Sequence, residues 1–143
     1  LEEVKRRLAV GHGHVFGLYD AYMVNAVDSL KAGAAGLSCI QGNIYPDLVV
    51  WIANHFDDET RQEDVAKVQQ FFVDSMDLVH SAYPIIAKYS LQKRGFPISL
   101  YTRREVDPLT EDLKSQMDEL LLDVEMLHTE LGIESVFKKY LVQ

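Results

Sequence analysis

The residues of this chain best suited to catalysis or metal binding are its histidines, its carboxylates and one cysteine. His12 and His14 lie in a glycine-rich stretch, and His55 lies two residues before Asp57. Imidazole and carboxylate groups bind metals, but no third ligand stands at helical spacing from either pair. We therefore expect His12 and His14 to be solvated, and we expect no metal site. Cys39 has neither a histidine nor a helix N-terminus clearly beside it, so we expect a small buried residue and not a nucleophile.

The composition narrows the classes of function. The chain has 143 residues, 48% of them hydrophobic, which is ample for a core. Fourteen Lys and Arg stand against 22 Asp and Glu, a net charge of −8. An acidic chain without a basic run is a poor candidate for binding nucleic acid or an anionic membrane. A single cysteine excludes an internal disulfide and fits a reducing compartment, so we expect a cytoplasmic protein.

Two short apolar runs, His14 to Leu18 and Leu37 to Ile40, have the length of β-strands. A helical pattern follows each run. The first is expected from about residue 21, with Asp20 as its N-cap, and the second from Pro46. This strand–helix–strand–helix order predicts parallel pairing through right-handed crossovers.

That order is typical of a parallel α/β barrel, which needs eight strand–helix units over roughly 250 residues. The predicted fold class is therefore α/β: the C-terminal portion of a TIM (β/α)8 barrel, about two strand–helix units, followed by an all-helical appendix. We expect the last barrel units in residues 1–57 and the helical region in residues 58–143. The chain does not begin with Met, and we expect the other barrel units upstream.

Residues 58–143 carry helical patterns only. Thr60 to Glu63 fits a capping box, Pro84 should restart the helix that follows, and residues 96–108 read as a loop. The last long helix is expected from about Thr110 to Gly132. Its apolar residues alternate by four and three, which predicts a seam against another helix: Leu113, Met117, Leu120, Val124, Leu127 and Leu131.

Three segments, in order, resemble the dihydrodipicolinate synthase/N-acetylneuraminate lyase family. The stretch from Gly33 to Pro46, GAAGLSCIQGNIYP, is similar to that family's last barrel strand and the turn after it. Tyr83 to Lys88, YPIIAK, resembles its Pro-x-x-x-Lys segment. Arg103 followed by Pro108 to Thr110 resembles the Arg-x-Pro-Leu stretch before its final helix.

The resemblance implies a class I aldolase-type lyase, which cleaves or condenses pyruvate or a related 2-oxo acid. In that family a lysine on the sixth strand forms a Schiff base, a tyrosine on the fifth strand relays protons, and a segment on the second strand holds the carboxylate. All three would precede Leu1. We therefore expect no catalytic residue, no metal and no cofactor in this chain, and no activity from the chain alone. The resemblance also implies a homo-oligomer, either a dimer or a homotetramer.

The lysines agree with this expectation. A Schiff-base lysine needs its pKa lowered by burial at the end of a strand. Every lysine of the chain falls in a segment expected to be helix or tail: Lys5, Lys31, Lys67, Lys88, Lys93, Lys114, Lys138 and Lys139.

The expected contribution of this chain is part of a substrate-pocket wall. Active sites of such barrels lie at the C-terminal ends of the strands, where residues 17–20 and 38–43 are expected. By the resemblance, the Ser38 carbonyl approaches the Schiff-base lysine and Ile40 contacts the distal part of the substrate. The predicted pocket residues are Gly17, Asp20, Ser38, Ile40 and Asn43.

Structural alternatives exist for several of these residues. Asp20 is either a plain helix cap or a ligand for a substrate hydroxyl, and Ser38 is either a backbone acceptor or a filler of the barrel interior. We expect Lys88 and Arg103 to pair with carboxylates between the barrel and the appendix. Trp51 is expected in the core or in a subunit contact.

A second hypothesis belongs to another class of function. The chain is then a non-catalytic helical interaction or oligomerisation module derived from this fold. Its support is the apolar surface that part of a barrel must cover, either by oligomerising or by binding a partner. The partners expected from both hypotheses are a 2-oxo acid, further copies of the chain, or the missing N-terminal part of the same protein.

Overall fold

The computed structural model describes residues 1–11, 13 and 15–140. His12, His14 and Leu141 lie outside the described residues, so the expectation for the two histidines stays a prediction. Within the described part of the chain, no group of three or more His, Cys, Asp or Glu side chains is placed to hold a metal ion. The chain begins with helix α1 (Glu2–Leu8).

Two short strands, β1 (Tyr19–Asp20) and β2 (Gly36–Leu37), pair in parallel as predicted. The register places Tyr19 opposite Gly36 and Asp20 opposite Leu37. One further backbone bond extends the pairing beyond the ladder at each end, from Ala35 N to Leu18 O and from Ser38 N to Asp20 O, each 2.7 Å.

The predicted positions of the strands are shifted. The first was expected over His14 to Leu18, but β1 begins at Tyr19. The second was expected over Leu37 to Ile40, but the chain enters the 3-10 helix η2 (Ile40–Asn43) soon after β2. A strand forms only where a partner backbone runs alongside, and in this structure that stretch is residues 18–20 against 35–38.

The helices after the two strands follow local signals. The 3-10 helix η1 (Met23–Asn25) leads into α2 (Ala26–Lys31), and Gly33 follows with a φ of +104°. Helix α3 (Pro46–His55) begins with Pro46, whose fixed φ suits the first helical turn. Asp20 is not the N-cap of the first of these helices, because Tyr22 occupies that position.

The remaining elements are helices: η3 (Glu59–Arg61), α4 (Gln62–Asp74), α5 (Met76–His80), α6 (Ile85–Lys93), α7 (Glu111–Leu131) and α8 (Val136–Tyr140). The predicted capping box at Thr60 is wrong. Asp58 is instead the N-cap of η3: its carboxylate accepts from the Thr60 backbone N at 2.9 Å and from the Thr60 hydroxyl at 2.6 Å. Pro84 separates α5 from α6, as expected.

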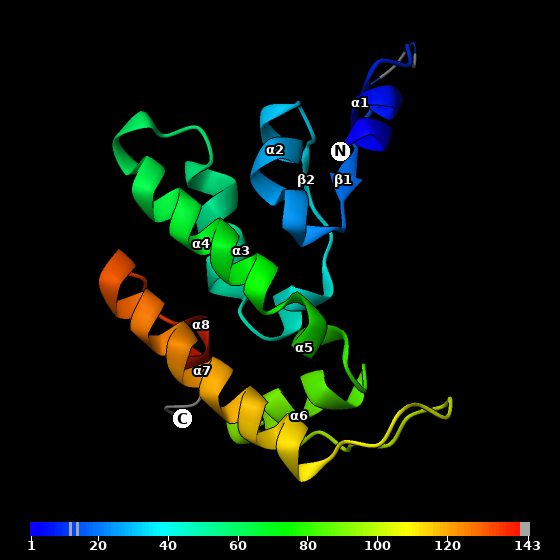
Figure 1. The fold of residues 1–143 in the computed structure, drawn as a ribbon, viewed down its shortest axis with the longest axis vertical. Helices are drawn as coiled ribbons and strands as arrows, with labels where there is room; N and C mark the ends of the chain where they lie inside the picture. Colours follow the sequence, from blue (N-terminus) through cyan, green and yellow to red (C-terminus); the bar gives the residue numbers. More distant parts are fainter. Residues whose placement is uncertain (12, 14, 141–143) are drawn as a thin grey trace.

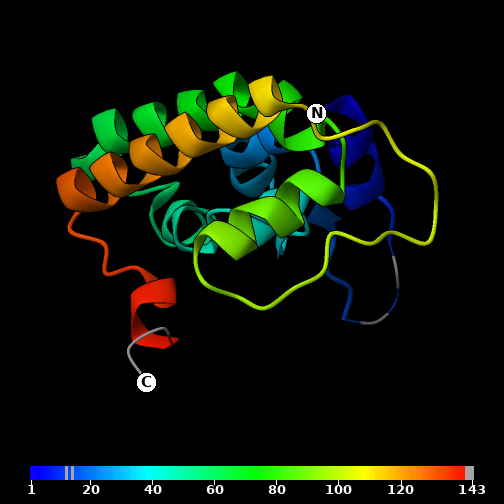
Figure 2. The same cartoon turned by 90° about the horizontal axis from the view of Figure 1, so that it is seen from below.

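Helix α7 has the predicted ends and the predicted buried stripe. The Thr110 hydroxyl oxygen accepts from the Leu113 backbone N at 3.2 Å, and Gly132 ends the helix in the left-handed region at φ +69°. Five of the six predicted stripe residues are buried: Met117, Leu120, Val124, Leu127 and Leu131. Helices α4 and α7 lie side by side in both views (Figure 1, Figure 2), and Lys67 and Glu130 form an ion pair between them.

One hydrophobic cluster runs from Met23 of η1 to Leu131 of α7, so the predicted barrel and helical regions share a core. At its centre Tyr45 is fully buried, with its ring stacked on Phe72 at a centroid distance of 5.6 Å. Trp51 also belongs to this cluster, as expected. None of the helices in the described residues has both the length and the apolar character needed to cross a bilayer.

The loop over residues 96–108 stands away from the helices (Figure 1, Figure 2, yellow-green). It leaves the body after α6 and returns at the start of α7. Its position as a loop was predicted from its two prolines.

Candidate functional site

The two faces of the strand pair differ in what covers them. On one face, the Asp20 carboxylate bonds to Ser29 of α2, and Leu37 packs against the core cluster. On the other face, the Tyr19 ring lies over Gly36, where an added Cβ would stand 2.9 Å from the ring. Because side chains alternate along a strand, Ser38 follows Gly36 onto this second face. We call the second face the open face.

The open face is poorly covered. The Tyr19 side chain is 61% exposed and Ser38 is exposed. Val15 and Tyr22, before and after β1, are also exposed. Parallel strands in proteins are normally covered on both faces and paired along both edges. The open face and its neighbouring edge are therefore less covered than parallel strands usually are.

Asp20 is held by its own chain. One carboxylate oxygen accepts from the Tyr22 backbone N at 3.1 Å, and the other accepts from the hydroxyl of Ser29. Ser29 is fully buried, so this bond satisfies a polar group that water cannot reach. The arrangement ties the end of β1 to α2. It also directs the carboxylate toward the helices, away from the open face.

The other predicted pocket residues do not form one cluster. Gly17 precedes β1 and approaches Ala35, at the opposite end of the strand pair from Ser38. Ile40 is half-buried against the core cluster. The Asn43 side chain donates to the Ile40 carbonyl at 3.0 Å, within its own turn. Ser38 lies on the open face at the carboxyl end of the strands. Gly17 faces the same side at the other end, because a Cβ added there would stand 3.4 Å from the Tyr19 ring. The pocket role of all five residues stays a prediction.

Cys39 and His55 occupy packed positions. Burial raises the pKa of the Cys39 thiol, so the residue stays protonated and weakly nucleophilic at neutral pH. His55 is half-buried: its ring stacks on Trp51 at a centroid distance of 4.5 Å, and its Nδ1 lies 2.7 Å from the Trp51 carbonyl. Asp57 is exposed, and among the described residues neither side chain belongs to a group that could hold a metal ion.

Four of the lysines have pKa shifts that disfavour nucleophilic catalysis. None of the chain's lysines lies on β1 or β2. A hydrogen bond to a carboxylate raises the pKa of four of them above the ordinary value: Lys67, Lys93, Lys114 and Lys138. A Schiff-base nucleophile needs the opposite shift, because only the neutral amine attacks a carbonyl carbon.

Lys88 and Arg103 do not form the predicted ion pairs. The Lys88 ammonium donates to the backbone carbonyl of Tyr101 in the 96–108 loop. Among the described residues, no carboxylate lies within ion-pairing distance of Lys88, Arg103 or Arg104. All three side chains line one pocket.

Sequence reasoning missed two features of interest. Tyr19 on the open face could have been found, because it alternates with Asp20 along the strand. Arg104 offered no such signal, since its position depends on where the 96–108 loop meets α6.

Comparison with known proteins gives one structural match. The fold is similar to that of YagE, a prophage protein of the dihydrodipicolinic acid synthase family from E. coli K12, whose crystal structure contains pyruvate. The TM-score is 0.63 and the sequence identity 21%, over 77% of this chain and 37% of the YagE chain. No family model and no curated protein matches the sequence. The chain therefore shares its fold with part of a dihydrodipicolinic acid synthase family protein and spans little more than a third of that protein's length.

Proposed function

We propose that this chain is the C-terminal part of a Schiff-base lyase that acts on pyruvate or a related 2-oxo acid. The main support for this proposal is the fold match to a pyruvate-bound member of the dihydrodipicolinic acid synthase family. In this proposal residues 1–57 supply the last two strand–helix units of a TIM barrel, and residues 58–143 form the helical region that follows it.

The strand pair supports this assignment. A parallel pair of two residues each is too small to be stable by itself, and its open face carries the exposed Tyr19 ring. Further parallel strands beside β1 would cover that edge and enclose the open face as the interior of a barrel. In the proposal these strands come from the preceding part of the same protein.

The nucleophile of the proposed enzyme lies outside this chain. The amine of a lysine on one of the other strands would attack the substrate ketone, and loss of water would give the imine. This chain would close the barrel and supply wall residues near the strand ends, with Ser38 on the open face as the best placed. Gly17, Asp20, Ile40 and Asn43 would then act mainly by shaping the backbone around it.

Trapping of the imine tests the proposal. The protein expressed from its complete gene is incubated with pyruvate and sodium borohydride, which reduces the imine to a stable secondary amine. We expect peptide mass spectrometry to find the adduct on one lysine outside residues 1–143. The 143-residue chain treated in the same way should stay unmodified and serves as the matched control.

The other outcomes separate the two hypotheses. An adduct on a lysine of this chain would contradict the assignment of the nucleophile. Absence of any adduct from the complete protein would exclude the lyase and leave the interaction module, which the exposed side chains around β1 also favour. Size-exclusion chromatography with light scattering would then show whether that surface is covered by a second copy of the chain.

A further inference from the structure

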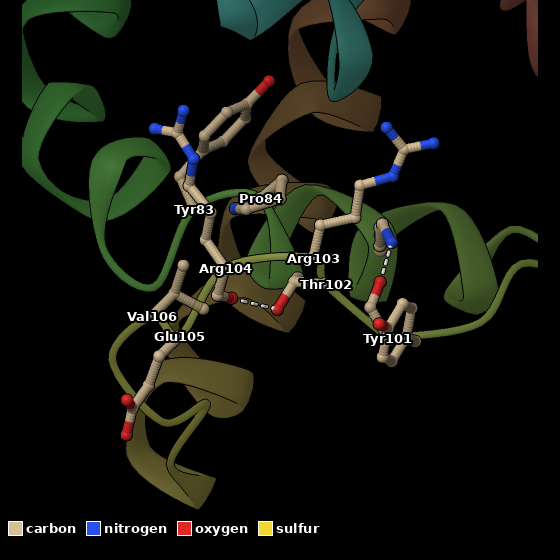
Figure 3. Close-up of a pocket in the computed structure, with 9 residues that line it drawn as sticks. Tyr83, Pro84, Tyr101, Thr102, Arg103, Arg104, Glu105 and Val106 are labelled. Carbon is tan, nitrogen blue, oxygen red and sulfur yellow. Dashed lines mark hydrogen bonds between the residues drawn. The ribbon is translucent and has the colours of Figure 1, made fainter.

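The 96–108 loop and the start of α6 enclose a pocket of about 770 Å³ (Figure 3). Its polar lining includes Tyr83, Lys88, Tyr101, Thr102, Arg103 and Arg104. The volume lies in the range of small-molecule sites and exceeds what a single inorganic ion would fill.

The charge of this pocket is opposite to that of the chain. The chain carries a net charge of −8, whereas the pocket gathers three cations and one carboxylate, Glu105. In Figure 3 the Glu105 side chain extends away from the side chains of Arg103 and Arg104. The pocket is therefore a local positive site on an acidic protein, which attracts anions at close range.

These cations also differ from the other basic residues of the described chain. Eight of those others form ion pairs with carboxylates: Lys5, Arg6, Arg7, Arg61, Lys67, Lys93, Lys114 and Lys138. Lys31 bonds to the side chain of Gln62, and Arg94 lies over the Phe137 ring. Lys88 is held by a backbone carbonyl, and Arg103 and Arg104 have no carboxylate partner in the described structure. Their charge is left available to a ligand.

The loop backbone positions the two arginines. The Lys88 ammonium fixes the carbonyl of Tyr101, and the Thr102 hydroxyl donates to the Arg104 carbonyl at 2.7 Å. These bonds hold the residues on both sides of Arg103. In Figure 3 the two arginine side chains diverge from this backbone, so they present two separated guanidinium groups. A ligand that uses both needs two separated anionic groups.

We propose that this pocket binds a small dicarboxylate. A guanidinium group matches a carboxylate with two parallel hydrogen bonds, so two diverging arginines suit the two ends of a short dicarboxylic acid. The Tyr83 ring, beside the Arg104 side chain, and Pro84, between the two arginines, supply apolar walls for the carbon chain (Figure 3). The inference depends on no property of the proposed lyase.

Calorimetric titration tests the site on the protein expressed from its complete gene. Succinate is the probe, with acetate and inorganic phosphate for comparison. We expect succinate to bind once per chain, more tightly than either comparison anion and less tightly as salt is added. Arg103→Gln and Arg104→Gln should each weaken binding about tenfold or more. Arg61→Gln removes a half-buried arginine that pairs with Asp64 and does not line the pocket, so it should leave binding unchanged.

A second measurement avoids substitution. Phenylglyoxal modifies accessible arginines, and mass spectrometry reports the rate at each site. Succinate should slow the modification of Arg103 and Arg104 but not of Arg61. The proposal is overturned if succinate does not bind, if it binds equally well to both variants, or if it fails to protect the two arginines. Binding of phosphate or acetate as tight as that of succinate would overturn the assignment to a dicarboxylate.

Discussion

The Nε2 atom of His128 on α7 lies 3.8 Å from the Oδ2 atom of Asp47 on α3. The same Asp47 oxygen accepts a hydrogen bond of 3.1 Å from the backbone N of Val136, where α8 begins. His128 is only 3% exposed, and neither of its ring nitrogens has a hydrogen-bond partner in the described structure. This histidine is therefore buried without a hydrogen bond, but near a carboxylate, at the place where α3, α7 and α8 meet.

The free energy of unfolding should fall as the pH drops below about 6.5. Burial lowers the pKa of His128, although Asp47 and Glu125 act in the opposite direction and Arg94 and Lys138 add to the lowering. A folded-state pKa below the unfolded value means that the unfolded chain binds the proton more readily. The contribution of neutral His128 to the free energy of unfolding is therefore complete above the pKa of the unfolded state. It is lost as the pH falls through the pKa of the folded state. Urea unfolding between pH 5 and 8 measures it.

Two histidine variants isolate this effect. His128→Leu removes the titrating group and its unpaired nitrogens. The slope of the free energy of unfolding against pH, between about pH 5 and 7, should therefore become shallower. His80→Gln changes an exposed histidine and should leave the slope as in the unsubstituted protein. An unchanged slope in His128→Leu would show that another group governs the acid sensitivity.

Asp20→Ala should destabilise the protein by about 1–3 kcal/mol, because the buried Ser29 hydroxyl loses its acceptor. Ser29→Ala should cost less, since it removes the buried donor together with the bond. The exposed Asp57→Ala is the matched control and should be neutral. Denaturant unfolding gives the three values. If Asp20→Ala instead leaves stability intact and lowers kcat/KM of the proposed lyase, Asp20 belongs to the substrate pocket.

The long helices were predictable because their signals are local. Thr110 begins α7 through a hydrogen bond within its first turn, and Gly132 ends it through its own positive φ. The apolar stripe between them repeats with the helical period. The strands were placed less well, because pairing of Tyr19 with Gly36 depends on where two distant segments meet. The capping box failed for a smaller reason: Asp58, two residues earlier, competes for the Thr60 hydroxyl and backbone N.

The candidate sites were less predictable than the helices. The sequence placed Ser38 near the end of a parallel strand, which needed only the order of the elements. The direction of the Asp20 carboxylate could not be predicted in this way, because it depends on the tertiary contact with Ser29. The pocket at Arg103 and Arg104 arises where an irregular loop meets α6, and such a meeting leaves no periodic pattern. The buried position of His128 likewise depends on contacts with α3 and α8.

Tyr45→Phe should destabilise the protein by about 1 kcal/mol. The Tyr45 hydroxyl lies 2.9 Å from the Ser75 Oγ, and that Oγ donates to the Phe71 carbonyl at 2.8 Å, so Tyr45 must donate to Ser75. Phenylalanine keeps the stacking on Phe72 and removes only this bond. The exposed Tyr101→Phe should have no effect on stability. A loss above about 3 kcal/mol would mean that the ring packing had also changed.

Gly132→Ala should destabilise the protein by about 1 kcal/mol, although an added methyl group meets no atom within 4 Å. The cost is conformational, because Gly132 holds a φ of +69° at the end of α7, a region that alanine occupies with strain. Gly42→Ala is the matched control: it also has no atom within 4 Å of the added carbon and needs no positive φ. Gly42→Ala should be neutral or slightly stabilising. Equal effects of the two substitutions in urea unfolding would exclude the left-handed conformation of Gly132 as the cause.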